Sequence, residues 1–230
     1  MPMKRQETVV ISVGGSLISP PKGIDTGFLR SLKRFVEAHI KKGYRFVIIT
    51  GGGATSRSYQ AAGRKVGDLA SEDLDWLGVH STRLNGHLLR SIFRAIAAPA
   101  LVKSFSTPLP DTPVVIAAGV SPGWSTDYVA VRMAKKAKAK RLINLSDIDF
   151  VYTADPKKNK KAVPIRDTTW PTFRKLIPTK WDPGAHTPFD PVASKEAARL
   201  KLEVAMIRGT AFKELSNYLA GKPFKGTLIS

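Results

Sequence analysis

The sequence predicts an α/β fold in which a parallel β-sheet is covered by helices on both faces. Short β-branched segments alternate with longer segments of helical periodicity, and this alternation is typical of such sheets. The chain has 230 residues, of which 43% are hydrophobic, so it can bury the core of one sizeable domain. Three of the predicted strands end in glycine-rich turns, which also indicates where a ligand would bind.

The first half of the chain supplies three of the predicted strands. Thr8–Val13 is a β-branched run that leads directly into Gly14-Gly15-Ser16. The next segment, Thr26–Lys42, has apolar residues at helical spacing, and Gly43 stands where a glycine often caps the carboxyl end of a helix. The other elements predicted here are a strand at Arg45–Thr50, helices at Ala54–Lys65 and Asp73–Ile96, and a strand at Pro113–Ala118.

The second half continues the alternation after a loop at Ser121–Thr126. The predicted elements are a helix at Asp127–Lys138, strands at Arg141–Leu145, Glu203–Ile207 and Gly226–Ile229, and helices at Asp190–Leu202 and Ala211–Leu219. Pro178–Pro188 is rich in proline, threonine and glycine, so we expect a mobile loop there.

The composition limits the classes of protein to which the chain can belong. It has no cysteine, which excludes a disulfide scaffold and a cysteine-ligated metal site and is compatible with a reducing cytoplasm. The amino-terminal segment is too short for a signal-peptide core, and no window approaches the roughly 20 apolar residues of a membrane helix. We therefore expect a soluble cytoplasmic protein without a membrane partner.

The formal net charge of +19 is the unusual feature of the composition. Such a charge attracts nucleic acid, anionic membranes and phosphorylated metabolites alike. Two segments, Lys135–Arg141 and Lys157–Lys161, are especially rich in lysine, and the simplest interpretation of both is solvated surface. No RNA-binding or helix-turn-helix signature accompanies them, so nucleic-acid binding is possible but has no supporting motif.

The glycine-rich turns carry the first indication of chemistry. They are Gly14-Gly15-Ser16, Gly51-Gly52-Gly53 and the segment from Gly119 to Gly123. In an open α/β sheet, ligands bind at the carboxyl ends of the strands. Glycines there let backbone N–H groups approach phosphate oxygens, and the following helix adds partial positive charge. None of the three turns fits GxxxxGK[ST] or GxGxxG, so the sequence predicts a phosphorylated ligand bound in another way.

Several motifs, in this order along nearly the whole chain, resemble the amino-acid kinase superfamily and, within it, the archaeal-type UMP kinases. They are the strand–GGS opening, ITGGGATSR, LGVHSTRLNGHLL, SPGWSTD, NLSDIDFVYTADPKK, FDPVASKEA and the closing GTLIS. The resemblance implies a three-layer αβα sandwich around a mainly parallel sheet, forming a single domain over residues 1–230. About residues 1–120 would bind the phosphate acceptor and about residues 121–230 would bind ATP.

The resemblance also implies an activity and an assembly. The activity would be Mg²⁺-dependent transfer of the γ-phosphoryl group from ATP to UMP, giving UDP for pyrimidine nucleotide synthesis. Members of the family are commonly hexameric, so a homo-oligomer is expected.

The resemblance further assigns residues to three groups. The UMP-binding group is Gly52, Asp75, Ser121, Pro122, Gly123, Trp124, Ser125, Thr126 and Asp127. The ATP-binding group is Gly15, Ser16, Gly53, Arg57, Ser146, Tyr152 and Asp155. The catalytic group is Asp127, Arg57 and Lys195, with Asp127 organising the cations around the transferring phosphate; no protein metal ligand is assigned.

Each of the charged residues also has a simpler structural interpretation. Arg57 could be a solvent-facing cation on its helix, and Asp155 with Pro156 could form an ordinary turn. Asp75 could cap the long helix near its start, and Asp127 could be the N-cap of its own helix.

The long helix and the tryptophans leave further alternatives open. His80 and His87 are expected to be packed or interface residues, and Arg83 could contact either an interface or the acceptor. The tryptophans are expected to be structural, although Trp124 could line the base pocket; the others are Trp76, Trp170 and Trp181.

The chain departs from the family pattern at four positions. Ser12 and Ala54 occupy positions where the related kinases carry lysines, and Lys195, Lys22 or Arg57 could replace those charges. Phe150 stands in place of a glycine beside the ATP pocket, so that turn is expected to be reshaped. Trp124 stands where smaller or polar side chains are common.

These departures keep other functions open. One is a kinase for another small acceptor, such as isopentenyl phosphate or an amino-acid carboxylate, although Asp75 and the helix that follows it favour a nucleotide. A second is a nucleotide- or anion-binding or storage protein with little or no turnover. A third is nucleic-acid binding through the charged surface.

Overall fold

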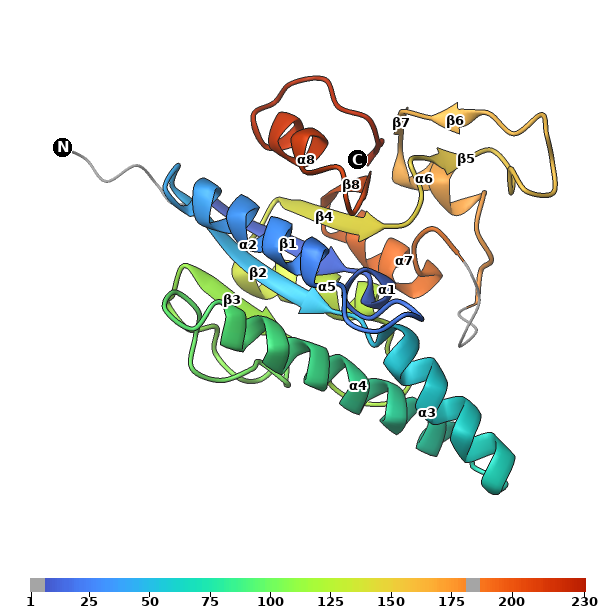
Figure 1. Cartoon of the computed structure of the whole chain (residues 1–230). Coiled ribbons are helices and arrows are strands. Elements are labelled where there is room, and N and C mark those ends of the chain that lie inside the picture. The colour runs from blue at the N-terminus through green and yellow to red at the C-terminus, as the bar shows by residue number, and fades with distance from the viewer. Residues whose placement is uncertain (1–6, 181–186) are drawn as a thin grey trace.

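The computed structural model describes residues 7–180 and 187–230, which form an α/β sandwich (Figure 1). Its centre is a seven-stranded sheet with the order β3-β2-β1-β4-β8-β9-β7. All neighbouring strands in this sheet are parallel except β8 and β9, which are antiparallel. The predicted mainly parallel sheet is therefore confirmed.

The central strands are the buried β-branched segments that the sequence predicts. They are β1 (Glu7–Val13), β2 (Tyr44–Thr50), β3 (Val114–Ala117), β4 (Arg141–Ser146), β8 (Glu203–Arg208) and β9 (Thr227–Ile229). In β1 the five residues from Val9 to Val13 are all buried, as expected for a strand with a helical layer on each face.

Alternating side chains of each strand face two separate hydrophobic clusters. Val9, Ile11 and Val13 pack with α2 (Thr26–Ile40), α4 (Ser71–Ile92) and α8 (Phe212–Leu219). Val10 packs on the opposite face with α5 (Thr126–Ala137), α6 (Trp170–Arg174) and α7 (Pro191–Arg199). This is the predicted three-layer arrangement.

Short polar side chains set the starts of three of these helices. Asp25 accepts a hydrogen bond from the backbone N–H of Phe28 at 2.8 Å and caps α2. Ser125 caps α5 and Asp190 caps α7 in the same way. At the end of α2, Gly43 has φ +90°, which confirms the predicted glycine at the carboxyl end of that helix.

Helix α3 (Gly53–Val66) differs from the others because none of its residues is buried. It packs along the first turns of α4, and together the two helices project from the sandwich (Figure 1). In the described part of the chain, no helix is both long and apolar enough to cross a membrane.

The structure contains several short elements that the sequence analysis did not predict. They are α1 (Gly15–Ile18), the antiparallel pair β5 (Val151–Tyr152) and β6 (Pro164–Ile165), β7 (Asp167–Thr168) and α6. The helix expected to reach Ile96 ends at Ile92, because the next residues turn so that Ala97 can pair with Val114. Most of the loop expected at Pro178–Pro188, including Trp181, lies outside the described residues.

Candidate active site

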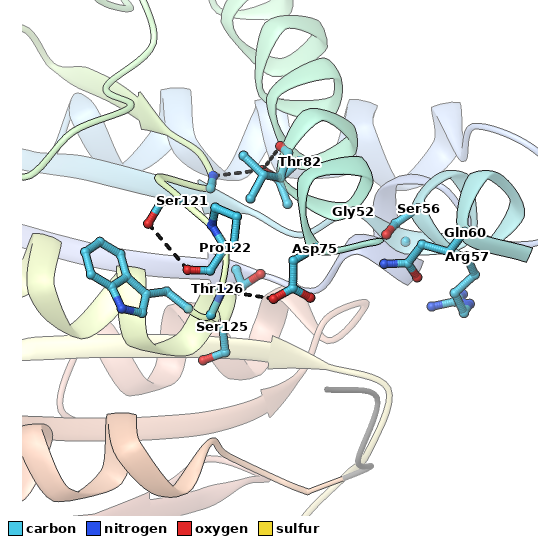
Figure 2. Close-up of a pocket in the computed structure, with 16 residues that line it drawn as sticks. Gly52, Ser56, Arg57, Gln60, Asp75, Thr82, Ser121, Pro122, Ser125 and Thr126 are labelled. Carbon is cyan, nitrogen blue, oxygen red and sulfur yellow. Dashed lines mark hydrogen bonds between the residues drawn. The ribbon is translucent and has the colours of Figure 1, made fainter. Parts of the chain in front are cut away.

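A cavity of about 330 Å³ opens at the carboxyl ends of the strands, between α3, α4 and the loop that follows β3. Side chains from all three segments surround it (Figure 2). The residues that line it are Gly52, Gly53, Ser56, Arg57, Gln60, Asp75, Gly78, Val79, Thr82, Gly119, Ser121, Pro122, Gly123, Trp124, Ser125 and Thr126.

The first two glycine turns lie in direct backbone contact beside this cavity. A Cβ atom on Gly15 would fall 2.0 Å from the backbone nitrogen of Gly53, and one on Gly53 would fall 2.3 Å from the carbonyl oxygen of Gly15. Gly53 also has φ +66°, a conformation that side chains disfavour. Glycine is therefore required on both sides of this crossing, which brings the backbone of β1 and β2 to one point.

Arg57 lies one turn into α3 and lines the cavity. Its side chain is exposed, and its Nη2 donates a hydrogen bond to Ser16 Oγ at 3.4 Å. The side chain is thus solvent-accessible and faces the site as well, so its two interpretations coexist.

Asp75 joins α4 to the loop across the cavity. Its Oδ2 accepts a hydrogen bond from the backbone N–H of Gly123 at 2.9 Å (Figure 2). The N-cap residue of α4 is Ala70, so the alternative in which Asp75 caps this helix is wrong. Gly123 has φ +80°, which lets its N–H face the carboxylate.

Two neighbouring residues of α4 hold the loop after β3 in place by hydrogen bonds. Thr82 Oγ1 accepts a hydrogen bond from Gly119 N–H at 2.7 Å. Arg83 donates from Nε to the carbonyl oxygen of Gly119 at 3.1 Å and from Nη2 to that of Val120 at 2.9 Å. Arg83 does not line the cavity. It therefore holds the loop in position, and the alternative in which it contacts the acceptor is not supported by its place in the structure.

Asp127 connects four segments beneath the site. Its Oδ1 accepts hydrogen bonds from Asn144 Nδ2 at 2.9 Å and from Ser12 Oγ at 3.5 Å. Its Oδ2 accepts one from the backbone N–H of Asp190 at 3.2 Å. Because Ser125 is the N-cap of α5, the expectation that Asp127 caps this helix is wrong; it lies in the first turn and points inward.

The surroundings of the Asp127 carboxyl change its titration. Burial raises its pKa to about 7, the negative charge of Asp190 adds to this, and the three hydrogen bonds oppose it. Within the described residues, no lysine or arginine forms an ion pair with Asp127. The side chain at the position of one missing lysine, Ser12, supplies a hydroxyl in its place.

Comparison with known proteins places this arrangement in a family. Residues 7–207 match the amino acid kinase family.

The chain belongs to the amino acid kinase family.

Several curated relatives and solved structures of this family are similar to the whole chain. The uridylate kinase of Hyperthermus butylicus is 31% identical, covering 96% of this chain and 97% of the relative, and that of Methanocorpusculum labreanum is 33% identical, covering 96% and 94%. The crystal structure of uridylate kinase from Archaeoglobus fulgidus superposes with a TM-score of 0.83 at 28% identity, covering 96% of this chain and 99% of that one. UMP kinase from Ureaplasma parvum shares the fold, with a TM-score of 0.75 at 19% identity and coverage of 99% and 100%.

Only some of the residues predicted to bind ATP in this amino acid kinase lie at the cavity. Gly53 and Arg57 line it, and Gly15 and Ser16 adjoin it through their contacts with these two residues. Ser146, at the end of β4, does not line it, and its backbone oxygen accepts a hydrogen bond from Gly209 N–H at 2.8 Å.

The remaining predicted residues lie on separate elements. Tyr152 is on β5, and Asp155 accepts hydrogen bonds that close an ordinary turn, including one from Lys157 N–H at 2.9 Å. Lys195 is exposed on α7 and does not line the cavity. Phe150 is buried, with Arg166 5.5 Å from its ring centre, and it does not adopt positive φ, so the turn differs from one built on glycine.

The structure adds residues that the sequence analysis did not select. Ser56 and Gln60 on α3 and Gly78, Val79 and Thr82 on α4 line the cavity. The α4 residues lie three, four and seven positions after Asp75, so helical spacing from a suspected site residue could have identified them. Asn144 and Asp190, which contact Asp127 across more than ten positions of sequence, had no such local signal.

Some of the histidines and tryptophans expected to be structural are buried, and others are exposed. His80 and His87 are exposed, and the His80 ring lies 5.8 Å from that of Trp76; the interface role of both stays a prediction. Trp170 is buried in the core, whereas Trp124 lines the cavity and is 41% exposed.

Proposed function

We propose that this amino acid kinase transfers the γ-phosphoryl group of ATP to UMP, giving UDP. The observation that carries the proposal is one cavity that joins all of the predicted acceptor residues except Asp127 to Gly53 and Arg57 at the glycine crossing. The similarity to uridylate kinases along nearly the full chain supports UMP as the acceptor.

The cavity has the size and polarity that a nucleoside monophosphate needs. Its volume of about 330 Å³ falls in the range typical of small-molecule sites. Asp75 uses Oδ2 to hold Gly123, and Oδ1 has no hydrogen-bond partner among the residues described. We propose that Oδ1 accepts a hydrogen bond from a ribose hydroxyl, while the loop from Ser121 to Thr126 surrounds the phosphate and base.

Phosphoryl transfer depends on positioning and charge stabilisation more than on covalent chemistry. The glycine crossing offers backbone N–H groups next to Arg57, which is the cationic side chain among the described residues that line the cavity. In this proposal Arg57 neutralises charge on the transferring group and replaces the lysines absent at Ser12 and Ala54.

The donor set fits a Mg²⁺ ion that arrives with ATP better than a resident metal. No group of three or more histidine, cysteine, aspartate or glutamate side chains able to hold a metal occurs in the described residues. Mg²⁺ typically binds through one or two carboxylates together with substrate phosphates. Asp127 would contribute a carboxylate, and the ion would stabilise negative charge on the phosphates.

A coupled assay of ADP release, with Mg-ATP and each nucleoside monophosphate, tests the proposal. We expect turnover with UMP that is lost in Asp127→Asn and falls about 10²–10³-fold in Arg57→Met, because each removes a preorganised charge. Arg64→Met is the matched control, since Arg64 is exposed on the same helix and does not line the cavity. Absence of turnover with every monophosphate would contradict the proposal.

A second candidate is a nucleotide-binding protein of the same fold with little turnover. The observation in its favour is that Asp127 forms no ion pair with a lysine or arginine in the described structure. Calorimetric binding of ATP and UMP without ADP release would support this candidate over the kinase.

Two further expectations concern the metabolic role of the product and the oligomeric state. UDP is a precursor for pyrimidine nucleotide synthesis, which would be the role of the product. The hexamer stays a prediction from the resemblance, and sedimentation of the purified protein would test it.

A further inference from the structure

The layer formed by α5, α6 and α7 and the residues that directly follow these helices carries many more cationic than anionic side chains, and we call its outer side the basic face. Its cationic residues are Arg132, Lys135, Lys136, Lys138, Lys140, Arg174, Lys175, Lys195, Arg199 and Lys201. The acidic residues in the same segments are Asp127 and Asp190, which point into the protein, and Glu196. The strongly positive charge of the chain is therefore poorly balanced on this face.

The cations of the basic face belong to one continuous surface because α5 packs directly against α7. Arg199 lowers the pKa of Glu196 through a hydrogen bond, and Lys135 and Arg132 on the neighbouring helix lower it further by their charge. Lys201 and Lys140 lie together at one end of the layer, where Glu203 N–H donates to the Lys140 carbonyl oxygen at 3.1 Å.

Aromatic rings adjoin the other end of this face. Trp124 lies 4.9 Å from Phe105 and 5.7 Å from Tyr128, measured between ring centres. Arg132 lies over Phe105, with its guanidinium carbon 4.6 Å from the ring centre, and it donates a hydrogen bond to the Tyr128 hydroxyl at 2.9 Å. Arg132, which is half-buried, thus connects α5 to a cluster whose Trp124 ring is 41% exposed.

We propose that the basic face, with the aromatic cluster at its end, binds single-stranded nucleic acid. A row of cations follows a phosphate backbone, and an exposed aromatic ring stacks with an unpaired base. The exposed ring of this cluster is Trp124, which also lines the active-site cavity, so the strand would end at that cavity. A second copy of the chain is a poor occupant, since like charges facing each other are repelled. On the same layer, Leu176 and Val192 are exposed apolar side chains, so binding to anionic lipid vesicles is one of the outcomes that the test below compares.

The test is fluorescence anisotropy with a labelled single-stranded RNA of about 20 nucleotides. The variant combines Lys135→Gln, Lys140→Gln and Lys201→Gln, three exposed residues outside the proposed active site. The matched control combines Lys158→Gln, Lys160→Gln and Lys161→Gln, three exposed lysines in the connection between β5 and β6. Both triple variants remove the same charge, so a difference between them reports the position of the charge.

We expect the basic-face variant to bind about tenfold or more weakly at about 100 mM salt, and the control variant to bind within about twofold of the original chain. The slope of log affinity against log salt should fall by about 2, since each lost phosphate contact removes about 0.7. ADP release should be the same for all three proteins. Equal weakening by both triple variants would overturn the proposal, because net charge alone would then explain binding.

Two further probes test the kind of ligand. An abasic oligonucleotide of the same length should bind about tenfold more weakly, because it lacks the bases that stack on the aromatic cluster. Equal binding of the abasic strand, or tighter binding to anionic lipid vesicles than to RNA at matched charge, would contradict the assignment to single-stranded nucleic acid.

Discussion

The carboxyl group of Asp127 lies inside the protein with hydrogen-bond donors around it and no cation paired to it within the described structure. Burial raises its pKa to about 7, whereas an aspartate in an unfolded chain has a pKa of about 3.9. Between these two values the folded state holds a proton that the unfolded state has released. The free energy of unfolding contributed by this group is therefore greatest at low pH and falls as the pH rises toward 7.

Replacing Asp127 by asparagine should remove this pH dependence. We expect Asp127→Asn to raise the melting temperature more at about pH 8 than at about pH 5, and the difference between the two gains should be about 3 °C or more, equivalent to roughly 1 kcal/mol. Calorimetric melting curves at both pH values measure the effect. The same gain at both values would mean that the carboxyl is ionised throughout this range.

Asp75 gives a prediction about substrate affinity. Asp75→Asn should raise the KM for UMP roughly 10–100-fold with a smaller effect on kcat, because a hydrogen bond to a charged acceptor is lost in the bound complex. Asp73→Asn is the control, since Asp73 is exposed in the same part of α4 and does not line the cavity. An equal rise of KM in both variants would show that the substitutions act through the stability of α4 and that Asp75 does not contact UMP.

Between elements, the crossing of the first two glycine turns is the most constrained contact. A Cβ atom at Gly15 would overlap the backbone of Gly53, which has no flexible side chain that could move away. We expect Gly15→Ala to lower the free energy of unfolding by about 1–3 kcal/mol and to abolish ADP release, because α1 and α3 must separate.

Gly67→Ala is the matched substitution at the end of α3. Its added carbon would lie 3.8 Å from Leu69, an ordinary contact, and Gly67 does not require positive φ. Its stability should stay within about 0.5 kcal/mol of the original chain. Denaturant unfolding of the two variants compares them, and a tolerated Gly15→Ala would mean that the crossing is looser than described.

The same scale separates what the sequence could predict from what it could not. The central strands and main helices follow local patterns, such as the buried run Val9–Val13 and the apolar face of α2, and these were predicted. The two-residue strands β5, β6 and β7 carry too few side chains for any periodicity, so they depend on distant partners.

The site divides in a similar way. The turns at Gly15, Gly53 and Gly123 were selected because glycines at the ends of strands let backbone N–H groups approach a phosphate, and the structure adds the positive φ of Gly53 and Gly123. The inward orientation of Asp127 depends on Asn144 and Asp190, which no local pattern connects to it. The sequence suggested a cap at Asp127 because Ser125, which lies two positions earlier and takes that role, was assigned only to the acceptor loop.

For the whole molecule, the net charge of +19 should weaken the folded state at low ionic strength. We expect the melting temperature to rise by about 3 °C or more between about 50 mM and 500 mM NaCl, because salt screens the repulsion between like charges. The triple variant at Lys158, Lys160 and Lys161 should already melt higher than the original chain at low salt. A melting temperature that falls with added NaCl would show that favourable ion pairs dominate instead.

The position of β9 in the sheet has a consequence for the order of assembly. Among the strands of residues 7–180 and 187–230, β7 pairs only with β9, although about sixty positions of sequence separate Thr168 from Ile229. Beyond β7, the N–H of Trp170 donates to the carbonyl oxygen of Ser230 at 3.1 Å. Strand β7 therefore has no strand partner in the described sheet until β9 has joined β8, so its amide groups should be among the last to gain protection from hydrogen exchange during refolding.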